Sequence, residues 1–150
     1  MVESDGAKAA DVPVSPGEGR YLCGLLYLSL LDCEPISNGD LATYLNVSGA
    51  SVTEMIETFD DDGLVEYERY GGAALTERGE AVAREILWRR CAVREFFETA
   101  AGVTLDDDRA YRIGFTLSEA EVHALSERVD QPCRGRYEAT TAADCDALAG

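Results

Sequence analysis

The side chains that could catalyse a reaction or hold a metal are few and scattered in this 150-residue chain. His123 is the single histidine. No glycine-rich phosphate loop, HExxH motif or nucleophile beside a base is present, so we do not expect an enzyme. The five cysteines are far apart, odd in number and without a CxxC pair, which argues against a disulfide framework: Cys23, Cys33, Cys91, Cys133 and Cys145.

The weak candidates for a metal ligand are Cys23, Cys91 and His123. The acidic run 106–108 could hold a hard cation, although three acids at such a place more often cap a helix. Cys91 lies among three arginines, and an electropositive setting favours a reactive thiolate. A small packed residue in a helix is the more ordinary interpretation. A redox-sensing pair in the tail, Cys133 with Cys145, stays open as an alternative.

The segment from Pro35 to Thr76 predicts a helix, a tight turn, a second helix and a short hairpin. Ser37 with Asp40 resembles a capping box, and Ser48 can cap the second helix. Gly71-Gly72 predicts the hairpin turn. The second helix has one apolar stripe at i, i+3, i+4 and i+7: Val52, Met55, Ile56 and Phe59. This is the layout of a winged helix-turn-helix.

Such a layout makes double-stranded DNA the expected ligand. Small side chains at the start of the second helix can approach base edges, and the free amides there favour phosphate. For base readout we expect Ala50, Ser51, Thr53 and Glu54. For phosphate contacts we expect Ser37, Asn38 and Ser48, with Gly49 at the same helix start. Arg69 and Tyr70 are predicted to touch DNA from the tip of the wing.

The charge of the chain opposes this interpretation at first sight. Its net charge is −16, from 29 acidic and 13 basic residues, whereas DNA-binding domains usually carry a basic footprint. A halophilic host would reconcile the two, because the Debye length falls to about 3 Å near 1 M salt and counterion release loses its advantage. The alternative is a protein-interaction module that binds a partner through its acidic face.

We expect a mainly α protein with a disordered arm (1–18), a winged helix-turn-helix (19–76), a helical dimerisation domain (77–130) and a tail (131–150). The apolar run 21–31 is too short to cross a membrane and no signal peptide precedes it, so we expect a cytoplasmic protein. The helix expected over 77–100 is about 36 Å long, and two helices are expected after it, over 106–115 and 119–129. Its excess length predicts a homodimer on a palindromic operator. The expected interface residues are Trp88, Val93, Phe96, Phe97, Val122 and Leu125.

The region from Tyr21 to about Val129 is similar to the diphtheria-toxin-repressor and manganese-transport-regulator (DtxR/MntR) family of metal-dependent repressors. The likeness rests on YL at 21–22, LA at 41–42, VSGASVTEMI at 47–56, DDGLVEYERYGGAALTERG at 61–79 and the AGV…LS frame over 101–118. The resemblance implies a homodimeric winged-helix repressor that binds a palindromic operator when loaded with Mn(II) or Fe(II).

The positions that hold the metal in this family carry other residues here. By the resemblance they are Arg20, Cys23, Arg90, Arg94, Tyr111, Gly114 and Phe115. Arginine cannot ligate a metal, and Mn(II) prefers carboxylate and imidazole. We therefore expect the family fold with no cofactor, and Arg90 and Arg94 in the former metal cavity paired with a carboxylate. A metal- or redox-responsive regulator with a relocated effector site is the alternative.

Overall fold

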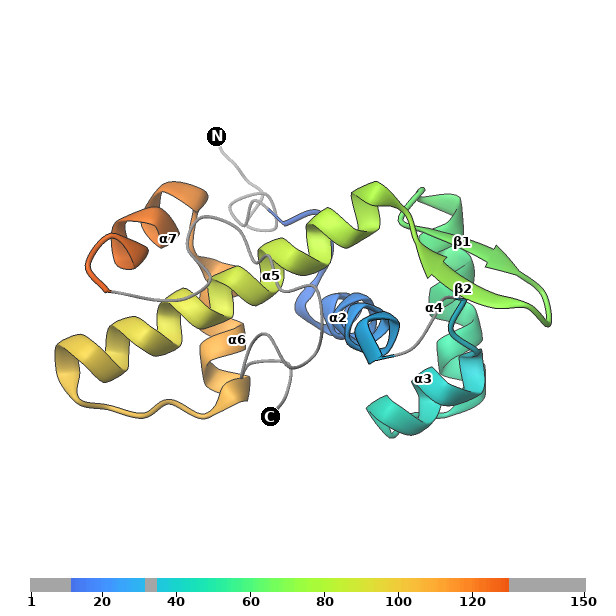
Figure 1. Ribbon diagram of the computed structural model, residues 1–150, viewed down its shortest axis with the longest axis horizontal. Coiled ribbons are helices and arrows are strands. Elements are labelled where there is room, and N and C mark those ends of the chain that lie inside the picture. The colour runs from blue at the N-terminus through green and yellow to red at the C-terminus, as the bar shows by residue number, and fades with distance from the viewer. Residues whose placement is uncertain (1–11, 32–34, 130–150) are drawn as a thin grey trace.

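The computed structural model describes residues 12–31 and 35–129 of the chain. It is mainly helical, with one antiparallel two-stranded sheet, β1-β2. Helix α5 runs across the molecule and joins the sheet and helices α3 and α4 at one end to α6 and α7 at the other (Figure 1). The elements are α2 (Pro16–Leu31), α3 (Asn38–Leu45), α4 (Gly49–Asp61), β1 (Val65–Glu68), β2 (Gly72–Leu75), α5 (Glu77–Phe96), a π-helical turn (Phe97–Ala101), α6 (Asp107–Thr116) and α7 (Glu119–Ser126).

The helix-turn-helix is formed by α3 and α4, and its boundaries follow the predicted caps. The Ser37 side chain accepts from the backbone amide of Asp40 at the start of α3. Asn46 ends that helix with a left-handed backbone, φ 59°, a conformation that asparagine tolerates. Ser48 accepts from the amide of Ser51 at the start of α4. The predicted apolar stripe of α4 is buried at Val52, Ile56 and Phe59, which fixes α4 on the core.

The wing is the hairpin of β1 and β2, paired from Val65 with Leu75 to Glu68 with Gly72. Its turn therefore covers residues 69–71, whereas the sequence predicted a turn at Gly71-Gly72. Gly72 lies in β2 with φ 97°, where an added Cβ would meet the carbonyl oxygen of Ile36 at 2.7 Å. Ile36 forms an isolated bridge to the wing at Ala73. The close approach of the segment before α3 to the wing thus explains why a glycine stands at this position.

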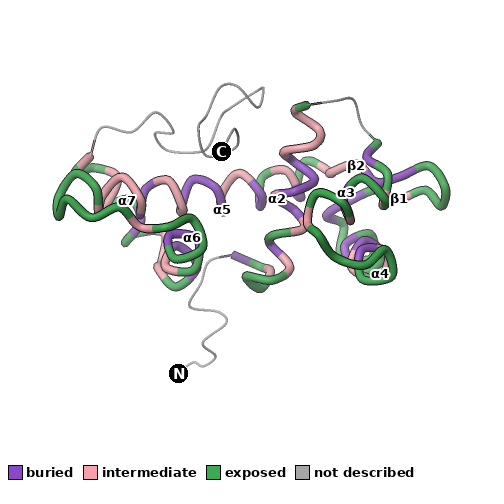
Figure 2. The backbone as a smooth tube through the Cα atoms, turned by 90° about the horizontal axis from the view of Figure 1, so that it is seen from below, coloured by how far each residue is buried: buried purple, intermediate pink, exposed green. Residues whose placement is uncertain are grey.

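Helix α5 begins at the predicted cap, Thr76, whose side chain accepts from the amide of Gly79. The predicted helix over 77–100 loses its α-helical pattern at Phe97 and continues as one π-helical turn. Gly102 closes the segment with φ 67°. Figure 2 shows buried stretches that alternate with partly buried stretches along α5. Helix α5 is therefore the common support of both halves of the chain.

The last two helices lie against α5. Asp106 caps α6 by accepting from the amide of Arg109. Ser118 and Glu121 form a reciprocal capping box at the start of α7. Helix α7 ends at Ser126, three residues before the predicted end. At the other end of the chain, α2 begins at Pro16, inside the expected disordered arm. Residues 1–11 of the predicted arm and the whole predicted tail, 131–150, lie outside the described residues.

Three of the residues that we expected at a dimer interface lie inside the protomer. Trp88, Val93 and Val122 are each 0% exposed, because α6 and α7 cover the face of α5 on which the sequence pattern placed them. These three residues therefore belong to the core of the chain and are corrected from interface to core. Phe96, Phe97 and Leu125 are half-buried. In the described ranges, no helix is both long and apolar enough to cross a membrane.

Candidate nucleic-acid interface

A cleft of about 350 Å³ lies where α3, α4 and the wing meet. It is lined by Ser37, Asn38, Thr53, Tyr67, Arg69, Tyr70 and Gly72. Five of these seven residues were predicted to contact DNA from the sequence. They come from the start of α3, the exposed side of α4 and the tip of the wing, so the fold brings three separate segments to one hollow.

Asn38 connects α4 and the wing within this cleft through two hydrogen bonds. Its Nδ2 donates to Oγ1 of Thr53 at 3.2 Å and to the hydroxyl oxygen of Tyr67 at 3.3 Å. Both hydroxyl groups act as acceptors in these bonds, so each keeps its own hydrogen to donate elsewhere. The Oδ1 of Asn38 is buried with no hydrogen-bond partner among the described residues. The cleft therefore offers two hydroxyl donors, whereas this acceptor is closed off from the surface.

The start of α4 is open to solvent. Gly49, Ala50, Ser51 and Glu54 are exposed, whereas Thr53 is half-buried. Ser48 caps the helix with its side-chain oxygen 3.1 Å from the amide nitrogen of Ser51. Small exposed side chains at a helix N-terminus permit close approach of an anionic or hydrogen-bonding ligand. The predicted readout residues thus stand on an accessible surface, and Thr53 faces the cleft.

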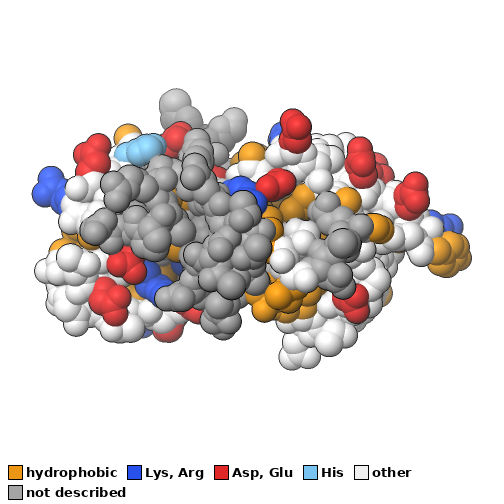
Figure 3. All heavy atoms as spheres, viewed as in Figure 1, with side chains coloured by type: hydrophobic (Ala, Val, Ile, Leu, Met, Phe, Trp, Pro, Cys, Tyr) orange, Lys and Arg blue, Asp and Glu red, His pale blue; other side chains and the backbone are white. Residues whose placement is uncertain are grey.

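The tip of the wing carries a cation and an aromatic ring. Tyr70 is 95% exposed and has a left-handed backbone, φ 68°. The guanidinium carbon of Arg69 lies 5.5 Å from the centre of the Tyr70 ring. A hydrophobic side chain and a basic side chain project together at the end of the molecule where Figure 1 places the hairpin turn (Figure 3). A fully exposed aromatic residue in a left-handed conformation is uncommon, and no other side chain in the described ranges covers this ring.

The outer face of α4 is acidic toward its C-terminal end. Its exposed carboxylates are Glu54, Glu57, Asp60 and Asp61, followed by exposed Asp62. Their charges oppose a polyanion at low salt. The first turn of α4, the cleft and the wing do not carry this row of carboxylates.

A second, smaller cavity of about 100 Å³ lies between the two halves of the molecule. Helices α2, α3, α5 and α6 contribute its lining: Arg20, Cys23, Gly24, Tyr44, Leu45, Leu87, Arg90 and Tyr111. Four of these eight residues stand at positions where the resemblance put metal ligands: Arg20, Cys23, Arg90 and Tyr111. The family's metal positions therefore do converge in space here.

The cavity carries two positive charges and a neutral thiol. Burial raises the pKa of the Cys23 thiol to about 12, although the charges of Arg90 and Arg20 act in the opposite direction. Burial also raises the pKa of Tyr111, whose hydroxyl donates to the carbonyl oxygen of Pro16 at 2.6 Å. The guanidinium of Arg20 lies 4.0 Å from the centre of the Tyr111 ring. At neutral pH, these groups present guanidinium and hydroxyl donors and no anionic ligand.

The acidic run 106–108 is committed to other contacts. Asp106 caps α6, Asp107 pairs with Arg94 at 2.7 Å, and Asp108 pairs with Arg20 and with Arg112. Arg94 therefore stands beside the cavity in an ion pair and does not line it, which corrects its predicted place. The expected pairing of an arginine with a carboxylate is found, but through Arg94 and Arg20.

The other candidate ligands are dispersed. The His123 ring lies 4.8 Å from the Trp88 ring and 3.7 Å from a carboxylate oxygen of Glu119. Cys91 is a half-buried thiol on α5 that is not in a disulfide. Over residues 12–31 and 35–129, no three His, Cys, Asp or Glu side chains are grouped as a metal site would need. Cys23, Cys91 and His123 are thus not brought together.

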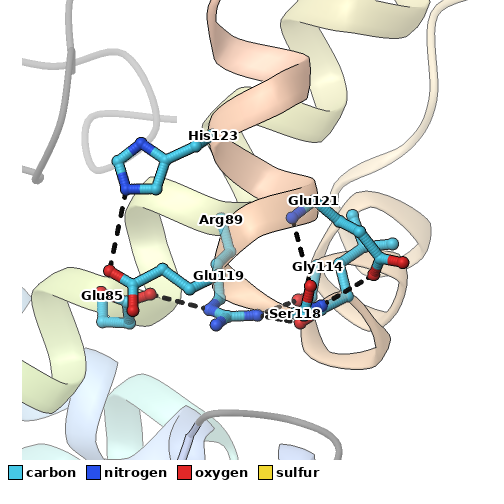
Figure 4. A network of polar contacts seen from close by, with 8 residues as sticks. Glu85, Arg89, Gly114, Ser118, Glu119, Glu121 and His123 are labelled. Atoms are coloured by element: carbon cyan, nitrogen blue, oxygen red, sulfur yellow. Dashed lines mark hydrogen bonds and ion pairs between the residues drawn. The ribbon is translucent and has the colours of Figure 1, made fainter.

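One buried network escaped the sequence analysis. Arg89 is 1% exposed; its Nε donates to Glu85 at 2.9 Å and its Nη1 donates to the carbonyl oxygens of Gly114 and Leu117. Figure 4 shows this guanidinium reaching from α5 to the segment between α6 and α7. Trp88, Arg89 and Arg90 follow one another on α5, and the sequence did not indicate which of them would point inward. Helical periodicity alone therefore did not predict that Arg89 is buried.

Comparison with known proteins agrees with the helix-turn-helix and wing described above. Residues 20–73 match the family model described as the iron dependent repressor, N-terminal DNA binding domain. The HTH-type transcriptional regulator MntR of Lysinibacillus sphaericus (strain C3-41) is 33% identical over 72 residues, which are 48% of this chain and 50% of that protein. Over this part of its length the chain is similar to the DtxR/MntR regulators. It spans about half the length of the curated relatives it matches.

Solved structures extend the likeness beyond the matched domain. The manganese regulator SloR is 26% identical, with a TM-score of 0.64 over 77% of this chain and 54% of that one. The T. acidophilum IdeR structure, at 23% identity, shares the fold with a TM-score of 0.66 and covers 85% of this chain and 61% of its own. The DtxR/MntR relatives are transcriptional regulators with a DNA-binding domain, not enzymes. The likeness in fold therefore includes α5 and the helices after it.

The metal that this family implies does not fit the donors in the second cavity. Arginine has no lone pair to give a cation, and the Cys23 thiol would first have to lose a proton that burial retains. The remaining side chains there are tyrosine hydroxyls and aliphatic groups. Mn(II) and Fe(II) require carboxylate or imidazole ligands, and none lines this cavity among the described residues.

Proposed function

We propose that this protein is a sequence-specific DNA-binding transcriptional regulator, acting as a repressor on a palindromic operator. The observation that carries the proposal is the cleft between α3, α4 and the wing, lined by five residues that the sequence independently predicted as DNA contacts. In helix-turn-helix proteins the second helix enters the major groove and presents its first residues to base edges. Helix α4 has the open first turn that this requires.

The hydrogen-bonding capacity of the cleft suits nucleic acid. The hydroxyl groups of Thr53 and Tyr67 accept from Asn38 and so keep hydrogens to donate to phosphate or base oxygens. Arg69 adds a cation for the backbone at the wing. These groups support readout of base edges and positioning on phosphates within one hollow.

We further propose that the regulator acts as a homodimer. Phe96 and Phe97 lie at the junction of α5 and the π-helical turn, half-buried, with ring centres 6.1 Å apart. Leu125 on α7 is also half-buried. These three are the predicted interface residues that the protomer leaves accessible. A two-fold dimer would place two copies of α4 on the two halves of a palindrome.

Regulation in this proposal does not use the family metal, because arginine and a protonated thiol occupy its positions. The high negative charge is reconciled with DNA by a salt-rich host cytoplasm, as the composition predicts. The exposed acids of α4 favour the second candidate function, a winged helix that binds a protein partner. Binding to DNA separates the two.

The test is titration of DNA from the protein's own promoter region in near-molar KCl, followed by fluorescence anisotropy. We expect tight binding with two chains per palindrome, unchanged by chelator, Mn(II), Fe(II) or oxidant. Thr53→Ala should weaken specific binding by about 1–3 kcal/mol, because the base contact and its support from Asn38 are both lost. Thr58→Ala is the matched control. Thr58 lies on the same helix, and the substitution also removes one hydrogen bond, from the Thr58 hydroxyl to the carbonyl oxygen of Glu54.

Equal operator affinity of Thr53→Ala and wild type would remove Thr53 from the interface. Binding only with Mn(II) or Fe(II) would show that ligands come from elsewhere and refute metal independence. A change with oxidant alone would point to the cysteines. Absence of binding to any promoter fragment would refute the DNA proposal and favour the protein-partner function.

A further inference from the structure

The cavity at the family's metal positions has a donor set that suits an anion. Arg20 comes from α2 and Arg90 from α5, and both charges act on the Cys23 thiol between them. Tyr44 adds a hydroxyl group, and burial favours its neutral form; the hydroxyl of Tyr111 already donates to the carbonyl oxygen of Pro16. No carboxylate lines the cavity among the described residues. Arg20 also pairs with the exposed carboxylate of Asp108 outside the lining, so an anion in the hollow would share Arg20 with that carboxylate and meet the charge of Arg90 inside.

We propose that this cavity is an effector site for a small oxyanion, such as phosphate, sulfate or a short carboxylate. Guanidinium groups bind these anions through paired N–H donors in a planar fork. Two guanidinium groups from different helices can hold one anion from two sides, with the hydroxyl of Tyr44 as a further donor.

The size of the cavity restricts the occupant. Its volume of about 100 Å³ exceeds several times the roughly 10–15 Å³ that one buried water needs by the same kind of measure. A tetrahedral oxyanion or an acetate-sized carboxylate fits this space. A nucleotide or a sugar phosphate would have to extend into solvent past Arg20, which is exposed.

The place of the cavity gives the anion a means to act on DNA binding, a step that rests on the proposed function. Tyr44 and Leu45 end α3, the helix that precedes the recognition helix, whereas Arg90 and Tyr111 belong to α5 and α6. An anion held by both groups would tie the helix-turn-helix to the rest of the chain. Anion binding and operator binding would then change each other's affinity by the same factor.

Isothermal titration calorimetry of the full chain with inorganic phosphate, sulfate and acetate, in the same KCl buffer and without DNA, tests the site. We expect saturable binding of one anion per chain for at least one of the three. Arg90→Gln and Arg20→Gln should each weaken it at least tenfold, and Arg90→Lys should weaken it less, because the charge is kept and the fork is lost. Arg109→Gln is the matched control, since it removes one positive charge from an exposed position of α6 outside the lining.

Preference for phosphate and sulfate over acetate identifies a tetrahedral oxyanion, and the reverse order identifies a carboxylate; either supports the site. Absence of saturable binding for all three anions overturns the proposal, as does unchanged affinity in the Arg20→Gln variant, which alters an exposed side chain and should fold. Operator titration with and without the anion is a separate arm. DNA binding without anion binding refutes only the effector site, whereas anion binding without DNA binding refutes only the regulator.

Discussion

Two ion pairs on α5 have the same spacing along the helix but differ in burial. Comparing them tests how burial changes the contribution of an ion pair to stability. Arg89 pairs with Glu85 and Arg84 pairs with Glu80, both one helical turn apart. The side chains of the first pair are 1% and 15% exposed, and those of the second are 17% and 47% exposed. We compare Arg89→Met with Arg84→Met, because methionine keeps most of the aliphatic volume and removes the charge.

The structure predicts very different costs. Arg89→Met leaves the Glu85 carboxylate without its guanidinium and removes the donor to the carbonyl oxygens of Gly114 and Leu117. Breaking a buried pair in this way costs about 3–5 kcal/mol. Since about 1 kcal/mol shifts Tm by roughly 2–4 °C at this chain length, Tm should fall by roughly 6–20 °C. Arg84→Met should cost about 0–1 kcal/mol, as exposed pairs do.

Urea denaturation followed by circular dichroism in near-molar KCl gives both free energies of unfolding. The double variant Arg89→Met/Glu85→Leu should recover stability relative to Arg89→Met, since no buried charge is left unpaired. Equal losses for Arg89→Met and Arg84→Met would refute the reasoning from burial. A double variant less stable than Arg89→Met would show that the network stabilises by more than its charge pairing.

Two further predictions concern packing and pH. Gly79→Ala should lower the free energy of unfolding and Tm strongly, because the added Cβ would clash with the carbonyl oxygen of Leu64. Gly49→Ala is the control and should change neither quantity strongly, because nothing lies within 4 Å of its added Cβ. Equal effects of the two substitutions in thermal melts would refute the close approach. Burial raises the folded pKa of Cys23 from 9.0 to about 12, so its contribution to stability is complete below pH about 9 and is lost as pH rises toward 12. The free energy of unfolding should fall over that window, less so in Cys23→Ala, and an identical pH profile for both proteins in urea melts would contradict the assignment.

The sequence by itself determined the DNA-binding half. Ser37, Asn46, Ser48 and Thr76 are side chains whose local hydrogen bonds or backbone tolerance end or begin a helix within a few residues. The stripe from Val52 to Phe59 has a helical period that admits one buried face. Information of this kind is short-range, so it can be read without knowing what the helix packs against.

Only the tertiary structure decided which of several equivalent side chains point inward. Trp88 and Arg89 lie next to each other on α5, and both are buried because α6 and α7 cover adjacent sides of the helix. Asn38 and Tyr67 meet across 29 positions of sequence, and Arg20 and Asp108 across 88. Such contacts depend on how the helices cross and which backbone groups need a partner, and no local pattern encodes them. The sequence therefore specified the elements and most of the residues that line the cleft between α3, α4 and the wing, whereas the packing of four helices around one cavity decided that arginines converge there.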